Sequence, residues 1–181
     1  DYSELRELLG TGKFIFMGSS TDILQEAVPD EWIERVFEYC CCFPENWYLF
    51  QSKNPERFFD FLDHMPLNRV LATTIETNRQ DLVDMVSKAP SLVKRRDAMT
   101  ALRAAKEIVQ VTIEPIIQFD IDELYIWMKQ IQPALIAIGA DSKNHHLPEP
   151  SGEQISNLLI MLKTIGCQVI EKPNLKRLMA R

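Results

Sequence analysis

Six short apolar runs, rich in β-branched or aromatic residues, occur along the chain and predict strands. They are Phe14 to Met17, Trp47 to Phe50, Val70 to Ile75, Val109 to Ile113, Leu135 to Ile138 and Gln168 to Ile170. Most of these runs are apolar throughout, which is typical of strands that are covered on both faces. The pattern therefore favours a parallel sheet with helices packed on it.

Amphipathic segments with helix-end signals lie between the runs and predict helices. Asn54, directly before a proline, fits the start of one helix. Ser151 with Gln154 three residues later has the form of a capping box that begins another. The stretch from Lys88 to Ile108 predicts two helical pieces, because Pro90 interrupts it.

The elements alternate strand then helix about six times, which predicts parallel strands joined by helical crossovers. Either a barrel or an open doubly wound sheet satisfies this order, and we favour the barrel. A complete eight-unit barrel usually needs about 200 residues or more. We therefore expect an α/β fold in which residues 1–181 form one domain, a partial (β/α)6 TIM-like barrel of parallel strands with outer helices.

Composition and charge narrow the function classes. The chain is 46% hydrophobic and contains no apolar run near the roughly 20 residues of a membrane span. It carries no signal sequence and only four cysteines, so we expect a cytoplasmic protein. The net charge of −6 does not indicate nucleic-acid binding. One local basic run, Lys94, Arg95 and Arg96, reads most simply as a solvated helix face.

Charged and polar residues follow each predicted strand directly. In strand–helix barrels the carboxyl ends of the strands share one mouth, where active sites are built. The tripeptides Thr74 to Glu76 and Thr112 to Glu114 each place Thr and Glu on one side of a strand. We expect a polar network at this mouth, which serves either a functional cavity or helix capping and structure; its charged members are Asp22, Lys53, Glu76, Glu114, Asp141, Lys143 and Lys172.

Two other groups of residues invite a metal assignment. Cys40, Cys41 and Cys42 are adjacent, and neighbours on a helix point about 100° apart, so they cannot all face one ion. His145 and His146 fall in a predicted loop without a ligand partner at standard spacing. We therefore predict no metal site.

Several sequence blocks carry a family resemblance. The blocks are Gly18-Ser19-Ser20 with Asp22, Val28 to Ile33, Ser52 to Arg57, Thr74 to Arg79, Ile113-Glu114-Pro115 and Ile138 to Asn144. They resemble the conserved blocks of a phage-associated family of uncharacterised function, which itself resembles radical S-adenosylmethionine (radical SAM) enzymes.

The resemblance implies a partial barrel that holds S-adenosylmethionine and a [4Fe–4S] cluster at its mouth, with three cysteines after the first strand as cluster ligands. No such cysteine loop precedes Phe14 in this sequence. We expect either an additional upstream segment that binds the cluster or a form without it. The residues that match the family blocks, and that the resemblance places around the cofactor, are Ser19, Ser20, Asp22, Lys53, Asn54, Glu76, Asn78, Glu114, Asp141, Ser142 and Lys143.

Three function hypotheses remain open from the sequence. The first is a radical SAM-like enzyme domain, inactive as this chain stands because thiolates must hold the cluster. The second is a non-catalytic phage or prophage module that binds a small molecule or a protein. The third is an ordinary barrel enzyme that uses Glu and Lys for acid–base chemistry.

Overall fold

The computed structural model describes residues 5, 7–84, 87–143 and 145–180. Six strands form one sheet in the order in which they occur in the chain, and every neighbouring pair is parallel. The strands are β1 (Phe14–Met17), β2 (Trp47–Gln51), β3 (Arg69–Thr74), β4 (Val109–Ile113), β5 (Leu135–Ile138) and β6 (Gln168–Glu171). This is the predicted α/β fold, an open sheet that forms part of a barrel.

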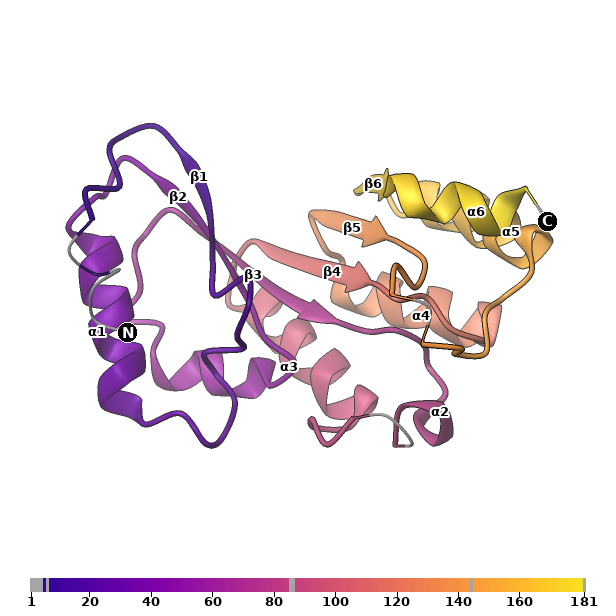
Figure 1. Cartoon of the computed structure of the whole chain (residues 1–181), viewed down its shortest axis with the longest axis horizontal. Coiled ribbons are helices and arrows are strands. Elements are labelled where there is room, and N and C mark those ends of the chain that lie inside the picture. Colours follow the sequence, from indigo (N-terminus) through magenta and orange to yellow (C-terminus); the bar gives the residue numbers. More distant parts are fainter. Residues whose placement is uncertain (1–4, 6, 85–86, 144, 181) are drawn as a thin grey trace.

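Helical segments connect the strands. They are α1 (Asp30–Cys41), the 3-10 helix η2 (Pro55–Asp60), α2 (Gln80–Asp84), α3 (Leu92–Ala104), α4 (Ile121–Ile131), α5 (Gly152–Lys163), the 3-10 helix η3 (Pro173–Leu175) and α6 (Lys176–Met179). Figure 1 shows α1, α3 and α4 along one side of the strands. Parallel strands need such crossovers, and the crossovers place the helices on the outer face.

The core lies between this outer face and the helices. Alternate strand residues such as Tyr48, Phe50, Val111 and Ile136 are fully or almost fully buried. They belong to one hydrophobic cluster with residues of the helices, including Phe37 of α1. Burial of this apolar surface holds the layers together, at about 25 cal/mol per Å² removed from water.

The inner face of the sheet carries the other set of strand residues, because successive side chains alternate. Here the expectation of strands buried on both faces is only partly correct. In β1, Phe14 is 63% and Phe16 is 44% exposed, and Trp47 beside them in β2 is 40% exposed. These rings are accessible because β1 is an edge strand and none of the described helices covers its inner side.

Of the helix predictions, one is confirmed and two differ from the structure. The capping box of Ser151 and Gln154 is confirmed, with both hydrogen bonds present. Asn54 precedes a 3-10 helix instead of an α-helix, and its side chain makes no capping bond. The prediction of two pieces between Lys88 and Ile108 is wrong, because α3 is one helix that begins after Pro90 and is capped by Ser91. Within the described ranges, no helix is both long enough and apolar enough to cross a bilayer.

Candidate functional site at the carboxyl ends of the strands

The turn after β1 brings the first strand end toward the second. Gly18 has φ +71° and a Cβ there would lie 2.7 Å from the Thr21 carbonyl oxygen, so the turn requires glycine. Asp22 then accepts hydrogen bonds from the backbone N–H of Leu24 (3.1 Å) and of Lys53 (2.8 Å). Asp22 therefore joins the loops that follow β1 and β2, while Ser19 and Ser20 are exposed in the turn.

The Glu76 cluster consists of Lys53, which follows β2, Glu76, which follows β3, and Arg95 of α3. Lys53 Nζ lies 2.5 Å from Glu76 Oε1, and Arg95 Nη1 lies 3.0 Å from Glu76 Oε2. The Glu76 side chain is 7% exposed and Arg95 is completely buried, whereas Lys53 is 38% exposed. One carboxylate is thus held between a buried cation and a cation at the surface.

Arg95 is a residue that the sequence analysis assigned wrongly. It is not part of a solvated face, since its guanidinium also donates to the carbonyl oxygens of Thr74 and Pro90. Its Nη2 is buried and has no hydrogen-bond partner among the described residues. Burial lowers the pKa of Arg95, and the charge of Glu76 opposes that effect. The signal was present in the sequence, because Leu92, Arg95, Met99 and Leu102 form one helical stripe.

The Glu114 cluster consists of Glu114, Lys172 and Asn174, which follow β4 and β6. Lys172 Nζ pairs with Glu114 Oε2, and Asn174 Nδ2 donates to Glu114 Oε1 at 2.9 Å. Gly139 at the end of β5 makes room for the carboxylate, because a Cβ there would lie 2.4 Å from Glu114 Oε1. The pair is partly exposed, at 23% for Glu114 and 39% for Lys172.

A ladder of uncharged polar groups lies between the two clusters on the inner face. Gln51 Nε2 donates to Thr74 Oγ1 at 3.0 Å, and Thr112 Oγ1 donates to Gln51 Oε1 at 3.4 Å. These residues belong to β2, β3 and β4, so the side chain of Gln51 reaches across the central strand. Such a reach fits a sheet that curves toward this face.

The loop after β5 is organised by Asp141. Its carboxylate accepts from the backbone N–H of Lys143 (2.9 Å) and contacts both the backbone N–H and the ring Nδ1 of His145. Burial raises the pKa of Asp141, but these hydrogen bonds outweigh it and the pKa lies below its ordinary value. His145 is therefore tied to Asp141, while Ser142 and Lys143 are exposed. Asn144 lies outside the described residues.

Two of the predicted site residues make structural bonds instead of joining either cluster. Asn54 donates from Nδ2 to the Leu24 carbonyl oxygen at 3.3 Å. Asn78 accepts from the backbone N–H of Asp120 and donates to Glu123 Oε2 at 2.7 Å, which joins the loop after β3 to the start of α4. Their side chains hold loops in place.

The cysteines bear on whether an iron–sulfur cluster fits. Cys40 is buried while Cys41 and Cys42 are exposed, so the three thiols face different ways as predicted. Burial raises the pKa of Cys40 to about 12, which keeps that thiol protonated at neutral pH. Within residues 5, 7–84, 87–143 and 145–180, no group of three His, Cys, Asp or Glu side chains could hold a metal ion. These residues therefore do not fit an iron–sulfur cluster.

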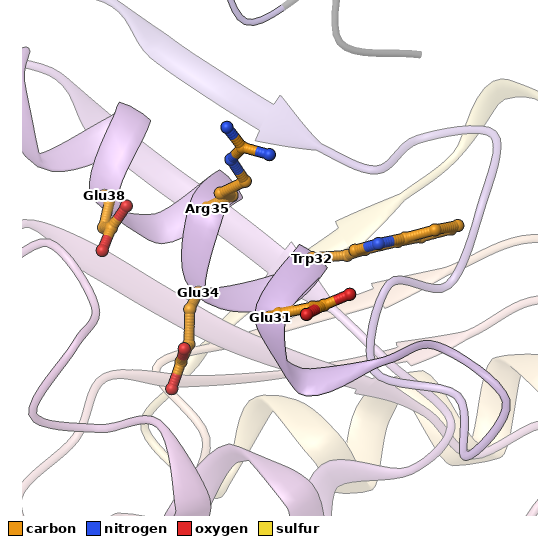
Figure 2. A pocket seen from close by; sticks show the side chains of 5 residues that line it. All are labelled: Glu31, Trp32, Glu34, Arg35 and Glu38. Atoms are coloured by element: carbon orange, nitrogen blue, oxygen red, sulfur yellow. The ribbon is translucent and has the colours of Figure 1, made fainter.

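Two surface depressions lie away from the carboxyl ends of the strands. The first, about 330 Å³, is lined by Glu31, Trp32, Glu34, Arg35 and Glu38. Figure 2 shows that all five come from α1 and point outward in different directions. The second, about 440 Å³, lies at the amino ends of β5 and β6 and includes Arg103, Lys129 and Gly166. Neither brings together groups from several strand ends, so the candidate site is the open carboxyl edge of the sheet.

No protein-family model and no curated protein matches the chain. Several solved structures are similar to it in fold. Spore photoproduct lyase complexed with dinucleoside spore photoproduct superposes with a TM-score of 0.60 and 11% identity, over 94% of this chain and 64% of that one. A mutant of the lyase with bound S-adenosylmethionine and dinucleoside spore photoproduct superposes with a TM-score of 0.55 and 11% identity, over 89% of this chain and 48% of that one. A radical SAM methyltransferase from Sphaerobacter thermophilus superposes with a TM-score of 0.59 and 15% identity, over 94% of this chain and 52% of that one.

These comparisons concern the fold, since the identities are low. The chain spans about half to two thirds of the length of the structures that it matches. The structural neighbours are radical SAM enzymes, and the chain has a radical SAM-like α/β fold.

Proposed function

We propose that this chain is a radical SAM-like domain that binds S-adenosylmethionine at the carboxyl edge of its sheet. The sequence blocks Ser52 to Arg57 and Ile138 to Asn144 support an association of this domain with phage. The observation that carries the proposal is the presence of two carboxylate–lysine pairs at one edge, Lys53 with Glu76 and Lys172 with Glu114. Each pair joins residues from different strand ends.

The chemistry of these groups suits a zwitterionic ligand. The methionine part of S-adenosylmethionine carries an ammonium and a carboxylate, which carboxylates and lysines bind by charge-assisted hydrogen bonds. Glu114 is the better acceptor for the ammonium, because its side chain is more exposed than that of Glu76. Lys172, released from Glu114, would then be free to meet the ligand carboxylate.

Isothermal titration calorimetry with S-adenosylmethionine tests the proposal. We expect saturable binding that Glu114→Gln weakens about 10- to 100-fold, the value of a hydrogen bond to a charged group. Glu34→Gln on α1 is the matched control, since the Glu34 side chain is 42% exposed, pairs with His64 and lies at the depression of Figure 2, and it should leave binding unchanged. Absence of binding, or equal loss in both variants, would overturn the proposal.

A second candidate, a non-catalytic binding or interaction module, is favoured by one observation. Both carboxylates are already neutralised inside the chain, Glu76 by Lys53 and Arg95, and Glu114 by Lys172. Such networks also serve purely structural ends. This candidate predicts no heat with S-adenosylmethionine and wild-type behaviour of Glu114→Gln, so the same titration separates the two.

A further inference from the structure

His145 is held by a buried carboxylate in the loop that follows β5. Its ring Nδ1 lies 2.9 Å from Asp141 Oδ1. The Asp141 side chain is 5% exposed, whereas that of His145 is 58% exposed. Within the part of the chain that the structure describes, the ring Nε2 makes no hydrogen bond. One edge of the imidazole is therefore anchored in the protein, and the opposite edge is open to a ligand.

The carboxylate of Asp141 is held in place independently of the imidazole. It accepts hydrogen bonds from the backbone N–H groups of Lys143 and His145, which complete the turn without the ring. Arg177 of α6 donates to the Asp141 carbonyl oxygen at 3.0 Å and also pairs with Glu149. Although burial raises the pKa of Asp141, its hydrogen bonds bring the pKa below the ordinary value. An ionised acceptor in a fixed position thus faces Nδ1.

This acceptor decides which ring nitrogen of His145 carries the proton. An ionised carboxylate can only accept hydrogen bonds, so Nδ1 must donate. In the neutral ring, Nε2 then has the unshared electron pair, and a proton taken up there gives an imidazolium that Asp141 stabilises. An imidazole that a carboxylate orients in this way has the arrangement of a general base.

The other two histidines of the sequence lack this arrangement. His64 Nδ1 lies 3.4 Å from Glu34 Oε1, and the two side chains are 52% and 42% exposed, so water screens the pair. His146 is exposed and has no carboxylate partner among the described residues. The buried partner therefore sets His145 apart from two histidines of similar exposure.

The Asp141 loop lies beside the Glu114 cluster at the carboxyl edge of the sheet. Asn174 donates to Glu114 Oε1 and to the carbonyl oxygen of Ala140, which directly precedes Asp141. One side chain thus joins the cluster to the start of the loop. Groups that could bind a ligand and a group that could take its proton are therefore neighbours in the fold.

We propose that Asp141 and His145 form an acid–base pair at the carboxyl edge, in which His145 Nε2 takes the proton of a hydroxyl group on a bound ligand. The O–H bond breaks, its electron pair stays on the oxygen, and the proton moves to Nε2. Asp141 acts through His145 as a positioning residue and balances the charge of the imidazolium. The step needs no further reactant. It goes beyond the binding of S-adenosylmethionine and does not depend on it.

Nitrogen NMR of the imidazole rings tests the positioning role of Asp141. We expect His145 to carry its proton on Nδ1, whereas His64 and His146 should mostly carry it on Nε2, as histidine does in water. Asp141→Asn keeps an oxygen that accepts from the backbone but loses the charge and gains donors, so the preference of His145 for Nδ1 should weaken. A proton on Nε2 of His145 in the wild-type chain would overturn the proposal.

Ring opening of the probe nitrobenzisoxazole tests proton transfer itself. A base takes the proton of a ring C–H group, the electron pair of that bond forms a nitrile, and the N–O bond breaks to give a coloured phenolate. We expect His145→Gln to lower the second-order rate constant about 10-fold or more, because a positioned general base contributes at least that much. Asp141→Asn should lower it about 10-fold, the value of a hydrogen bond to a charged group. His146→Gln is the matched control and should leave the rate constant unchanged.

These outcomes are distinguishable from those of the proposed function, because neither measurement contains S-adenosylmethionine. Equal rate constants for the wild type and His145→Gln would overturn the inference. So would a wild-type rate constant for Asp141→Asn, once circular dichroism shows that this variant is folded. A purely structural bond between Asp141 and His145 predicts both of these contrary results.

Discussion

The Glu76 cluster and the Glu114 cluster both pair a carboxylate with a lysine, but the second group that contacts the carboxylate differs between them. Under Glu76 lies Arg95, whose side chain has no exposed surface. Glu114 lies against the backbone of Gly139, and its second partner is the amide of Asn174. The first carboxylate is 7% exposed and the second 23%.

This difference separates a fixed part of the edge from an adaptable one. A buried ion pair costs much desolvation, and removal of one partner leaves an uncompensated charge. Glu76 is therefore locked in position by Arg95. The partners of Glu114 are partly in water, where screening makes their exchange for ligand groups inexpensive. The Glu76 cluster is therefore mainly structural, and under the proposed function the Glu114 cluster is the one whose partners a ligand would replace.

The largest expected effect comes from removing the buried cation. Arg95→Met should lower the free energy of unfolding by about 3–5 kcal/mol, because Glu76 loses its buried partner. Urea unfolding measures this loss. Lys94→Met, at the exposed neighbouring position, should change stability by less than about 0.5 kcal/mol. A loss below about 1 kcal/mol for Arg95→Met would remove the distinction between the two clusters.

The next effect tests the space under Glu114. Gly139→Ala should destabilise the fold by about 1–3 kcal/mol, because the new Cβ would lie 2.4 Å from Glu114 Oε1 and 3.0 Å from Asn174 Oδ1. The same substitution in a Glu114→Ala background should cost clearly less, since the first clash is gone. Equal costs in both backgrounds, measured by thermal unfolding, would show that Glu114 does not lie over Gly139.

A small effect is expected from breaking the exposed pair itself. Lys172→Met should change the free energy of unfolding by about 1 kcal/mol or less, because the pair is screened by water. The coupling between Lys172 and Glu114 in a double-mutant cycle should shrink further when salt is raised from 0.05 to about 1 M. A coupling free energy above about 2 kcal/mol that does not change with salt concentration would show that this pair behaves as a buried ion pair, like Glu76 and Arg95.

Much of this edge follows from the sequence because parallel strands have a common carboxyl end. The apolar runs show where each strand ends, and this places Glu76 and Glu114 at the same carboxyl edge of the sheet. Which lysine meets which carboxylate was not predictable, since that depends on the reach of long side chains across strands. Arg95 was missed because its neighbours Lys94 and Arg96 made the three look like a charged surface.

The exposure of the inner face of β1 could not be predicted from the sequence. An unbroken apolar run indicates burial on both faces only where something covers both faces. Phe14 and Phe16 have the same pattern as strands in the centre of the sheet, yet β1 is an edge strand and its rings are exposed. Strand order, which depends on long-range pairing, decides this.

The smallest expected effect concerns pH and the Asp141 loop. The pKa of Asp141 is below its ordinary value in the folded chain, so its contribution to stability is full above the unfolded pKa near 4 and is lost as pH falls through the folded pKa. Asp141→Asn should therefore be less stable than wild type at pH 7. The difference should narrow below about pH 4 in acid unfolding followed by circular dichroism. A difference that widens toward acid pH would contradict the hydrogen-bond pattern around Asp141.

The central claim is that ligand chemistry belongs to the carboxyl edge of the sheet. A nuclear magnetic resonance titration of the backbone amides with S-adenosylmethionine tests it most directly. The account predicts shifts at Gly18, Lys53, Gly139 and Lys172, with none at Glu34 on α1 or at Gly166 beyond the amino end of β6. Shifts confined to those last two positions, or no shifts at all, would contradict it.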